Sequence, residues 1–167
     1  MVSTKPDDEK VVVSNDWYIY DETEDKFVSK IVERYAGYIK EKWNLDISGN
    51  GKYAIELSLC VDKKEEYHEI IIEDGGIKII AGGSAGIQRA LYRLDDIASA
   101  NDGFFFDKAH YVREPRFDSR YIFSFCALYD SALETDSRVW CSDSLLEQYS
   151  RTGVNGIWLQ GILYRLT

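Results

Sequence analysis

The sequence is short of several residue types that specialised sites need, and each shortage excludes a class of protein. Its three cysteines, Cys60, Cys126 and Cys141, are widely spaced and form no C-x-x-C, so neither a disulfide framework nor a zinc site is expected. Its two histidines, His68 and His110, lie in no G-x-S-x-G or related motif, which argues against a nucleophilic triad. We therefore expect no metal and no other cofactor.

The sequence also lacks long apolar runs and an excess of basic residues. No segment approaches the ~20 apolar residues of a membrane helix, and residues 1–10 contain no apolar core of a signal peptide. The formal net charge is -9, whereas proteins that bind nucleic acid cluster Lys and Arg. We expect a soluble chain with no nucleic-acid and no membrane partner. Its compartment stays open, and a parent protein that is exported or periplasmic fits the sequence.

The acidic residues are concentrated in the first half of the chain. Residues 1–74 carry 18 acidic and 10 basic residues, and residues 75–167 carry 11 and 10. A calcium-binding loop fails as an explanation because no D-x-[DN]-x-[DN]-G spacing occurs. A solvated acidic face is the simpler interpretation. The adjacent pairs Asp95-Asp96 and Glu65-Glu66 are likewise interpreted as solvated charges on a helix and a loop.

Aromatic residues are plentiful. The chain has 12 Tyr and 4 Trp, and aromatics make up 14% of it. Such side chains fill hydrophobic cores, and their flat faces and polar edges also suit carbohydrate surfaces. Both interpretations stay open at this point.

The first part of the chain, residues 10–114, has the pattern of an α+β domain. Residues 1–9 look like a disordered leader. Apolar spacing predicts one helix over residues 23–44, which Asp21 and Glu24 would cap, and another over residues 87–98. We expect a mostly antiparallel sheet with both helices packed on one face. Lys10–Ser14 and Trp17–Tyr20 are predicted as one or two short strands, followed after the first helix by Tyr53–Cys60 and the hairpin Tyr67–Glu73 and Ile77–Ala81.

The glycine-rich stretch GGSAG (Gly82–Gly86) lies between a predicted strand and a predicted helix. A phosphate-binding loop can occupy such a position, but neither G-x-G-x-x-G nor G-K-[ST] is present. We interpret the stretch as a tight turn in which Ser84 caps the helix.

The pattern changes near Pro115, and residues 115–167 read as a linker followed by strand, helix and strand. The strands are predicted at Arg120–Leu128 and Asn155–Gly161. The helix is predicted at Ser142–Gly153, with Ser144 and Glu147 as a capping box. Both strands are continuous apolar runs, which is typical of strands in a parallel sheet buried on both faces.

Three segments together resemble glycoside hydrolase family 20, the β-N-acetylhexosaminidases. EEYHEIIIEDGGIKIIAGGSAGIQRALYRLDDI (Glu65–Ile97) resembles the small zincin-like α+β domain that precedes the catalytic barrel, and α-glucuronidases carry a similar domain. EPRFDSRY (Glu114–Tyr121) resembles the P-R-F-x-x-R-G that joins this domain to the barrel, with Tyr in place of Gly. YSRTGVNGIWLQG (Tyr149–Gly161) resembles the first barrel helix running into the second barrel strand.

The resemblance implies that residues 115–167 are the first β-α-β segment of an incomplete (β/α)8 barrel. The catalytic Asp-Glu pair of the family belongs to a later strand, so no catalytic residue is expected here. The family's Asp and Arg on the first strand fall at Phe125 and Leu128, and its two His on the second strand fall near Trp158 and Gln160. These last two are the candidate substrate-binding residues, by stacking and hydrogen bonding. Core packing is the alternative for Trp158.

The function implied is that of the non-catalytic N-terminal part of a glycoside hydrolase-like protein that breaks down carbohydrate. It would support the barrel and be inactive alone. The expected partners are the remaining barrel, a glycan and, through exposed barrel strands, further copies of the chain. The alternative is a free-standing module that binds carbohydrate or protein without enzymatic activity.

Overall fold

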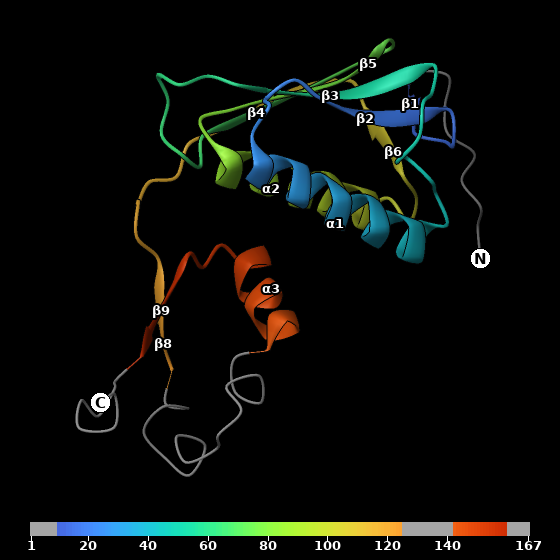
Figure 1. Cartoon of the computed structure of the whole chain (residues 1–167). Coiled ribbons are helices and arrows are strands. Elements are labelled where there is room, and N and C mark those ends of the chain that lie inside the picture. The colour runs from blue at the N-terminus through green and yellow to red at the C-terminus, as the bar shows by residue number, and fades with distance from the viewer. Residues whose placement is uncertain (1–9, 125–141, 160–167) are drawn as a thin grey trace. The chain divides into compact units, whose positions relative to one another are not determined.

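The computed structural model describes residues 10–124 and 142–159, and these form two compact units that divide between Pro115 and Arg116 (Figure 1). The leader proposed for residues 1–9 lies outside the described residues. The elements of the first unit are β1 (Lys10–Val12), β2 (Trp17–Asp21), α1 (Lys26–Trp43), β3 (Tyr53–Leu59), β4 (His68–Glu73), β5 (Gly76–Ala81), α2 (Ser84–Ala100), β6 (Phe105–Asp107) and β7 (Ala109–Arg113). Those of the second are β8 (Tyr121–Ser124), α3 (Asp143–Arg151) and β9 (Gly156–Leu159).

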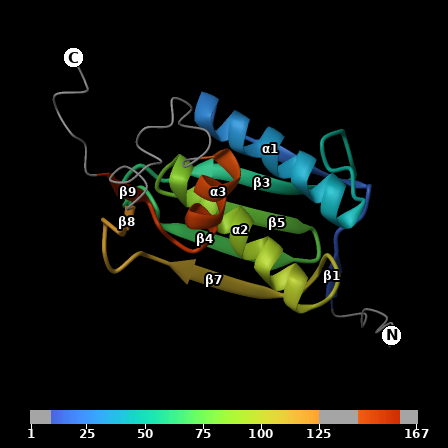
Figure 2. The ribbon, with the colours of Figure 1, turned by 90° about the horizontal axis from the view of Figure 1, so that it is seen from below.

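The first unit is an α+β layer, as the sequence predicts, with α1 and α2 side by side on one face of the main sheet (Figures 1 and 2). Its core lies between the helices and that face. The strands contribute alternate residues and the helices contribute one stripe each, which is the burial that amphipathic periods of 2 and 3.6 require. The largest fully buried side chains are Ile39, Ile47, Ile55, Leu57, Ile70, Ile72, Ile77, Ile79, Ile87, Leu91, Leu94 and Phe106.

The prediction of a mostly antiparallel sheet is wrong. The five strands are ordered β2-β3-β5-β4-β7, and the β2–β3 and β3–β5 pairs are parallel. Only β4 runs against its neighbours β5 and β7. The reason is topological. Helix α1 carries the chain back so that β3 starts beside the start of β2, and the β4–β5 hairpin inserts β5 between β3 and β4.

The starts of α1 and α3 differ from the predicted caps. Helix α1 is capped by Asp25, whose Oδ1 accepts from the amides of Phe27 and Val28 at 2.6 and 3.3 Å. Asp21 instead accepts from the amide of Thr23 in a local turn. In the second unit, the cap of α3 is Ser142, which accepts from the amide of Leu145, rather than Ser144.

In the second unit, β8 and β9 pair in parallel, with Tyr121 opposite Gly156 and Phe123 opposite Trp158. The strand–helix–strand order and the parallel pairing agree with the prediction. Burial of these strands on both faces does not hold, because Tyr121 and Trp158 are 67% and 65% exposed. The parts of the predicted strands beyond Ser124 and Leu159 lie outside the described residues, and so do Cys126 and Cys141.

Candidate functional site

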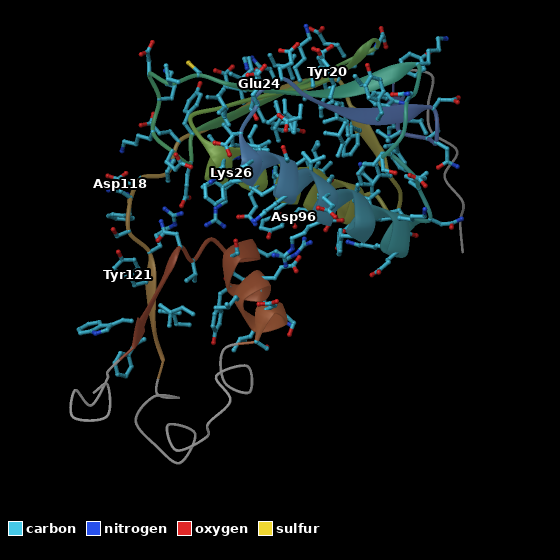
Figure 3. The ribbon with its side chains drawn as sticks, in the orientation of Figure 1. Tyr20, Glu24, Lys26, Asp96, Asp118 and Tyr121 are labelled. Atoms are coloured by element: carbon cyan, nitrogen blue, oxygen red, sulfur yellow. The ribbon has the colours of Figure 1, made fainter. Side chains whose placement is uncertain are left out.

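The predicted substrate-binding residue Trp158 lies on β9, on an exposed face of the β8–β9 pair. Its ring meets that of Phe123 edge-on, with the centroids 5.8 Å apart and the planes at 87°. Tyr121 belongs to the same face, since it is two residues from Phe123 on one strand. We call Tyr121, Phe123 and Trp158 the aromatic face. Figure 3 labels Tyr121 where it emerges from β8. Gln160, the second predicted residue, lies outside the described residues.

The aromatic face depends on Gly156. A Cβ at Gly156 would lie 2.2 Å from two ring carbons of Tyr121, so the tyrosine ring covers the glycine on the neighbouring strand. With 65% of its surface exposed, Trp158 is not a core residue of this chain. Exposed aromatic side chains of this kind stack on flat apolar surfaces, including sugar rings and other side chains.

Arg120 and Asn155 hold the start of the two strands together. The backbone amide of Arg120 donates to Asn155 Oδ1 at 2.8 Å, and the amide of Asn155 donates to the Arg120 carbonyl at 3.1 Å. Asn155 Nδ2 also donates to the Asp118 carbonyl at 2.7 Å, and Arg120 Nε donates to the Gly153 carbonyl at 2.7 Å. The second arginine of P-R-F-x-x-R, Arg120, therefore has a structural role here, in which it donates hydrogen bonds to backbone carbonyls.

The glycine-rich stretch before α2 is already occupied by a carboxylate of the chain. Glu65 Oε1 accepts from the amide of Ala85 at 3.1 Å and from Ser84 Oγ at 3.4 Å. The predicted cap Ser84 is instead the first helical residue, and Gly83 is the N-cap. An internal carboxylate at the positive end of the helix excludes a bound phosphate there. The loop is thus a structural turn, as predicted, with Glu65 in place of Ser84 as its capping side chain.

One of the carboxylates interpreted as solvated is buried. Asp95 on α2 is 3% exposed and accepts hydrogen bonds from α1 at both oxygens. Tyr38 Oη and Lys42 Nζ donate at 2.8 Å each and Trp43 Nε1 donates at 3.2 Å. Its neighbour Asp96 is exposed, as predicted (Figure 3).

This buried cluster shifts the pKa of both charged groups. Burial favours the protonated carboxyl of Asp95, but the hydrogen bonds from Lys42, Tyr38 and Trp43 outweigh burial and lower its pKa. Burial opposes the charge of Lys42 as well, and the bonds to Asp95 and Tyr38 outweigh it and raise the pKa of Lys42. Each shift stabilises the ion pair, so the cluster joins the helices and offers no free acid or base for catalysis.

Glu66 was also interpreted as solvated, and this too is wrong. Its side chain is 11% exposed and pairs with Arg89 on α2 at 3.3 Å. The adjacent Glu65 is exposed and caps the helix. Sequence alone offered no signal for either role, because both depend on α2 packing against the loop before β4.

The two histidines have separate environments. His68 is 8% exposed, and its Nδ1 lies 3.0 Å from the Glu66 carbonyl. Burial lowers the pKa of His68 and the nearby Arg113 lowers it further, so the ring is neutral near pH 7. His110 is exposed on β7 and contacts Glu69 Oε2 at 2.9 Å. Among the described residues, neither histidine forms a hydrogen bond with a Ser or Cys side chain.

On the face of β4, Glu69 also accepts a hydrogen bond from the hydroxyl of Tyr67. This bond raises the pKa of Tyr67 to about 12, because the tyrosinate would face a carboxylate. The hydrogen bond with Tyr67 and, as the second cause, the one with His110 lower the pKa of Glu69. The group is a polar network at one sheet edge. Across residues 10–124 and 142–159, no three His, Cys, Asp or Glu side chains gather as metal ligands would.

Within the part of the chain that the structure describes, no helix is both long enough and apolar enough to cross a bilayer. No protein-family model matches the sequence, and no curated protein matches it either.

Solved structures do match the fold. An exo-β-N-acetylglucosaminidase of glycoside hydrolase family 20 from Vibrio harveyi aligns with 89% of this chain at 17% identity and a TM-score of 0.63. A β-N-acetylhexosaminidase from Bacteroides fragilis aligns with 89% at 15% identity and a TM-score of 0.63. A family 138 enzyme targeting pectin rhamnogalacturonan II aligns with 64% at 13% identity and a TM-score of 0.53.

The chain spans a small part of each of these proteins: 22%, 29% and 16% of their lengths respectively. The resemblance to family 20 glycoside hydrolases that the sequence predicts is therefore confirmed in the fold. At these identities the likeness establishes the fold, and function is a separate question.

Proposed function

We propose that this chain is the non-catalytic N-terminal part of a glycoside hydrolase-like protein that takes part in carbohydrate breakdown. In this proposal the α+β unit supports a catalytic barrel, and β8, α3 and β9 are its first β-α-β segment. The chain would be inactive alone, and the remaining barrel would be its main partner.

One observation carries the proposal: β8 and β9 are a parallel pair with an exposed aromatic face. Parallel strands occur almost only in sheets with both faces covered, and a two-stranded parallel sheet is far below the usual size. Tyr121 and Trp158 therefore expose apolar surface that a complete barrel would enclose. The small share of the hydrolase structures that this chain spans supports the same conclusion.

No catalytic residue is proposed in this chain. Trp158 and Gln160 remain the proposed sugar contacts, because residues at the carboxyl ends of barrel strands line the site of barrel enzymes.

The test compares two proteins on a panel of aryl glycosides that includes the N-acetyl-β-glucosaminide: residues 1–167, and the product of the gene extended to its next stop codon. We expect the extended protein to hydrolyse at least one glycoside and the chain alone to match the buffer blank. Turnover by the chain alone, or an extended protein that is folded and inactive on the whole panel, would contradict the proposal.

The second candidate, a free-standing glycan-binding module, is favoured by the exposure of Tyr121 and Trp158. Titration of the chain with chito- and xylo-oligosaccharides, followed by tryptophan fluorescence, tests it. A saturable change that Trp158→Leu abolishes and that Tyr20→Leu, at an exposed aromatic residue of the first unit, preserves would support binding at the aromatic face. A flat response would leave this candidate without support.

A further inference from the structure

Strand β7 has one unpaired side. It pairs with β4 along one edge and with no second strand in the described residues, and Figure 2 shows it as the outermost strand of its sheet. The other outer strand, β2, differs because the Ile19 amide donates to the Ile47 carbonyl at 3.2 Å, which covers part of its edge. Within the five-stranded sheet, β7 therefore presents the open edge.

Strand β7 lacks two of the devices that keep edge strands from pairing, a bulge and a proline. Its register with β4 is continuous from Ala109 to Arg113, so it has no bulge, and Pro115 lies beyond its end. Exposed Val112, at 48%, adds apolar surface beside the edge. Such an edge accepts another strand readily.

The charges around β7 are complementary to a second copy of themselves. Lys108 lies three residues before Tyr111, and Glu114 lies three residues after it. When two copies of this segment pair in antiparallel fashion about Tyr111, Lys108 of each copy faces Glu114 of the other. The pairing brings opposite charges together twice, and it sets Tyr111 against Tyr111. Cross-strand pairs of both kinds are favourable.

We propose that the β7 edge is a homodimer interface, in which two chains join β7 to β7 about a twofold axis at Tyr111. The main sheets of the two copies then form one continuous sheet. Val112 lies opposite Glu69 in the register with β4, so it belongs to the sheet face without helices. On that face His110 of one copy faces Val112 of the other.

Existing ion pairs leave Lys108 and Glu114 available. Lys108 Nζ lies 2.7 Å from Asp74 Oδ1, with side chains 45% and 79% exposed. Glu114 lies 3.7 Å from Lys64, with side chains 52% and 47% exposed. Exposed pairs of this kind contribute little and exchange partners easily. The second copy is a better-matched partner than a charged peptide of one sign, since Lys108 and Glu114 on the two sides of β7 carry opposite charges.

A single short strand buries little area, so we expect a weak dimer at the low end of interface sizes. Sedimentation velocity from about 1 to about 500 μM covers the corresponding range of dissociation constants. The variants Lys108→Glu and Glu114→Lys each turn two symmetry-related attractive charge pairs into repulsive ones. Each is expected to raise the dimer dissociation constant at least about tenfold.

Mixing the two variants gives the decisive test. A Lys108→Glu chain carries two acidic ends and a Glu114→Lys chain two basic ends, so neither pairs with itself and the two pair with each other. We expect a 1:1 mixture to recover the dimer. Lys78→Glu serves as the charge control. It reverses an exposed charge in the centre of the sheet face without helices and should leave the dimer dissociation constant unchanged.

Three results would overturn this interface: a monomer at every concentration, a dimer that both reversals leave unaffected, or a mixture that stays monomeric. Trp158→Ser separates the proposal from association through the aromatic face, because it removes exposed apolar surface from the other unit. Dimerisation that disappears in Trp158→Ser and persists in both charge variants would count against β7. The proposal stands apart from the proposed function.

Discussion

At the scale of single residues, Asp95 links the two helices of the first unit most directly. It is a buried carboxylate that accepts hydrogen bonds from Tyr38, Lys42 and Trp43 of α1. Removing one partner of a buried pair is costly because the other charge loses its compensation. Lys42 is 34% exposed and so regains some water when Asp95 is replaced.

We expect Asp95→Asn to lower the free energy of unfolding by about 3 kcal/mol, at the lower end of the range for a broken buried pair. Asp96→Asn is the matched control. It changes an exposed neighbour on the same helix and should stay within about 0.5 kcal/mol of wild type. Urea unfolding followed by circular dichroism measures both. Equal effects of the two variants would contradict a role for Asp95 in joining the helices.

His68 makes a prediction about pH. Its pKa in the folded chain lies below the ordinary value of 6.5, so the unfolded chain takes up this proton first on acidification. The unfolded state then binds more protons, and stability falls as the pH drops below about 6.5. We expect His68→Gln to remove this decline.

The unfolding free energy measured from pH 8 to pH 5 checks this prediction. His110→Gln is the control, since His110 is exposed beside Glu69, and this variant should retain the decline. A pH profile that is the same in wild type and His68→Gln would show that another group causes the loss of stability.

At the scale of the elements, two glycines on the helices have opposite expected effects. Gly37 lies inside α1, and a Cβ there would meet nothing within 4 Å. Gly86 lies in the first turn of α2, and a Cβ there would lie 2.4 Å from the Tyr67 carbonyl oxygen. The glycine in α2 lets the loop before β4 approach the helix, and the glycine in α1 serves no such contact.

We expect Gly37→Ala to stabilise the chain by about 0.5–1 kcal/mol, because alanine is the better helix former. Gly86→Ala should destabilise it by about 2–3 kcal/mol, because backbone must move to admit the methyl group. Thermal and urea unfolding measure both variants. Stabilisation by Gly86→Ala would mean that the loop does not pack against α2 in this way.

The sequence predicted the elements better than their arrangement. Helices α1 and α2 and the β4–β5 hairpin follow from local periodicity and turn residues, so these were found. The position of β5 between β3 and β4 depends on which strands meet in space, and alternation along one strand carries no such information. The same limit applies to Asp95 and Glu65, whose partners lie on other elements.

The predicted site shows this limit too. Trp158 was predicted as a sugar contact from the family resemblance, and the structure places it exposed beside Phe123, so its role stays a prediction. Tyr121 was missed as its neighbour, although an aromatic residue two positions before Phe123 on one strand is a signal that the sequence contained.

At the scale of the whole molecule, the central proposal is that this chain forms part of a larger barrel-containing protein. It accounts for three features at once: the small share of each hydrolase that the chain spans, the parallel β8–β9 pair and the exposed aromatic face. A free-standing module would explain only the third of these features, the exposed aromatic face.

Reading the coding sequence of the source gene beyond the codon for Thr167 tests this claim most directly. The account predicts a frame that continues for several hundred codons with alternating strand and helix patterns and an acidic pair at the end of a later strand. A stop codon immediately after Thr167 in the native gene would contradict it.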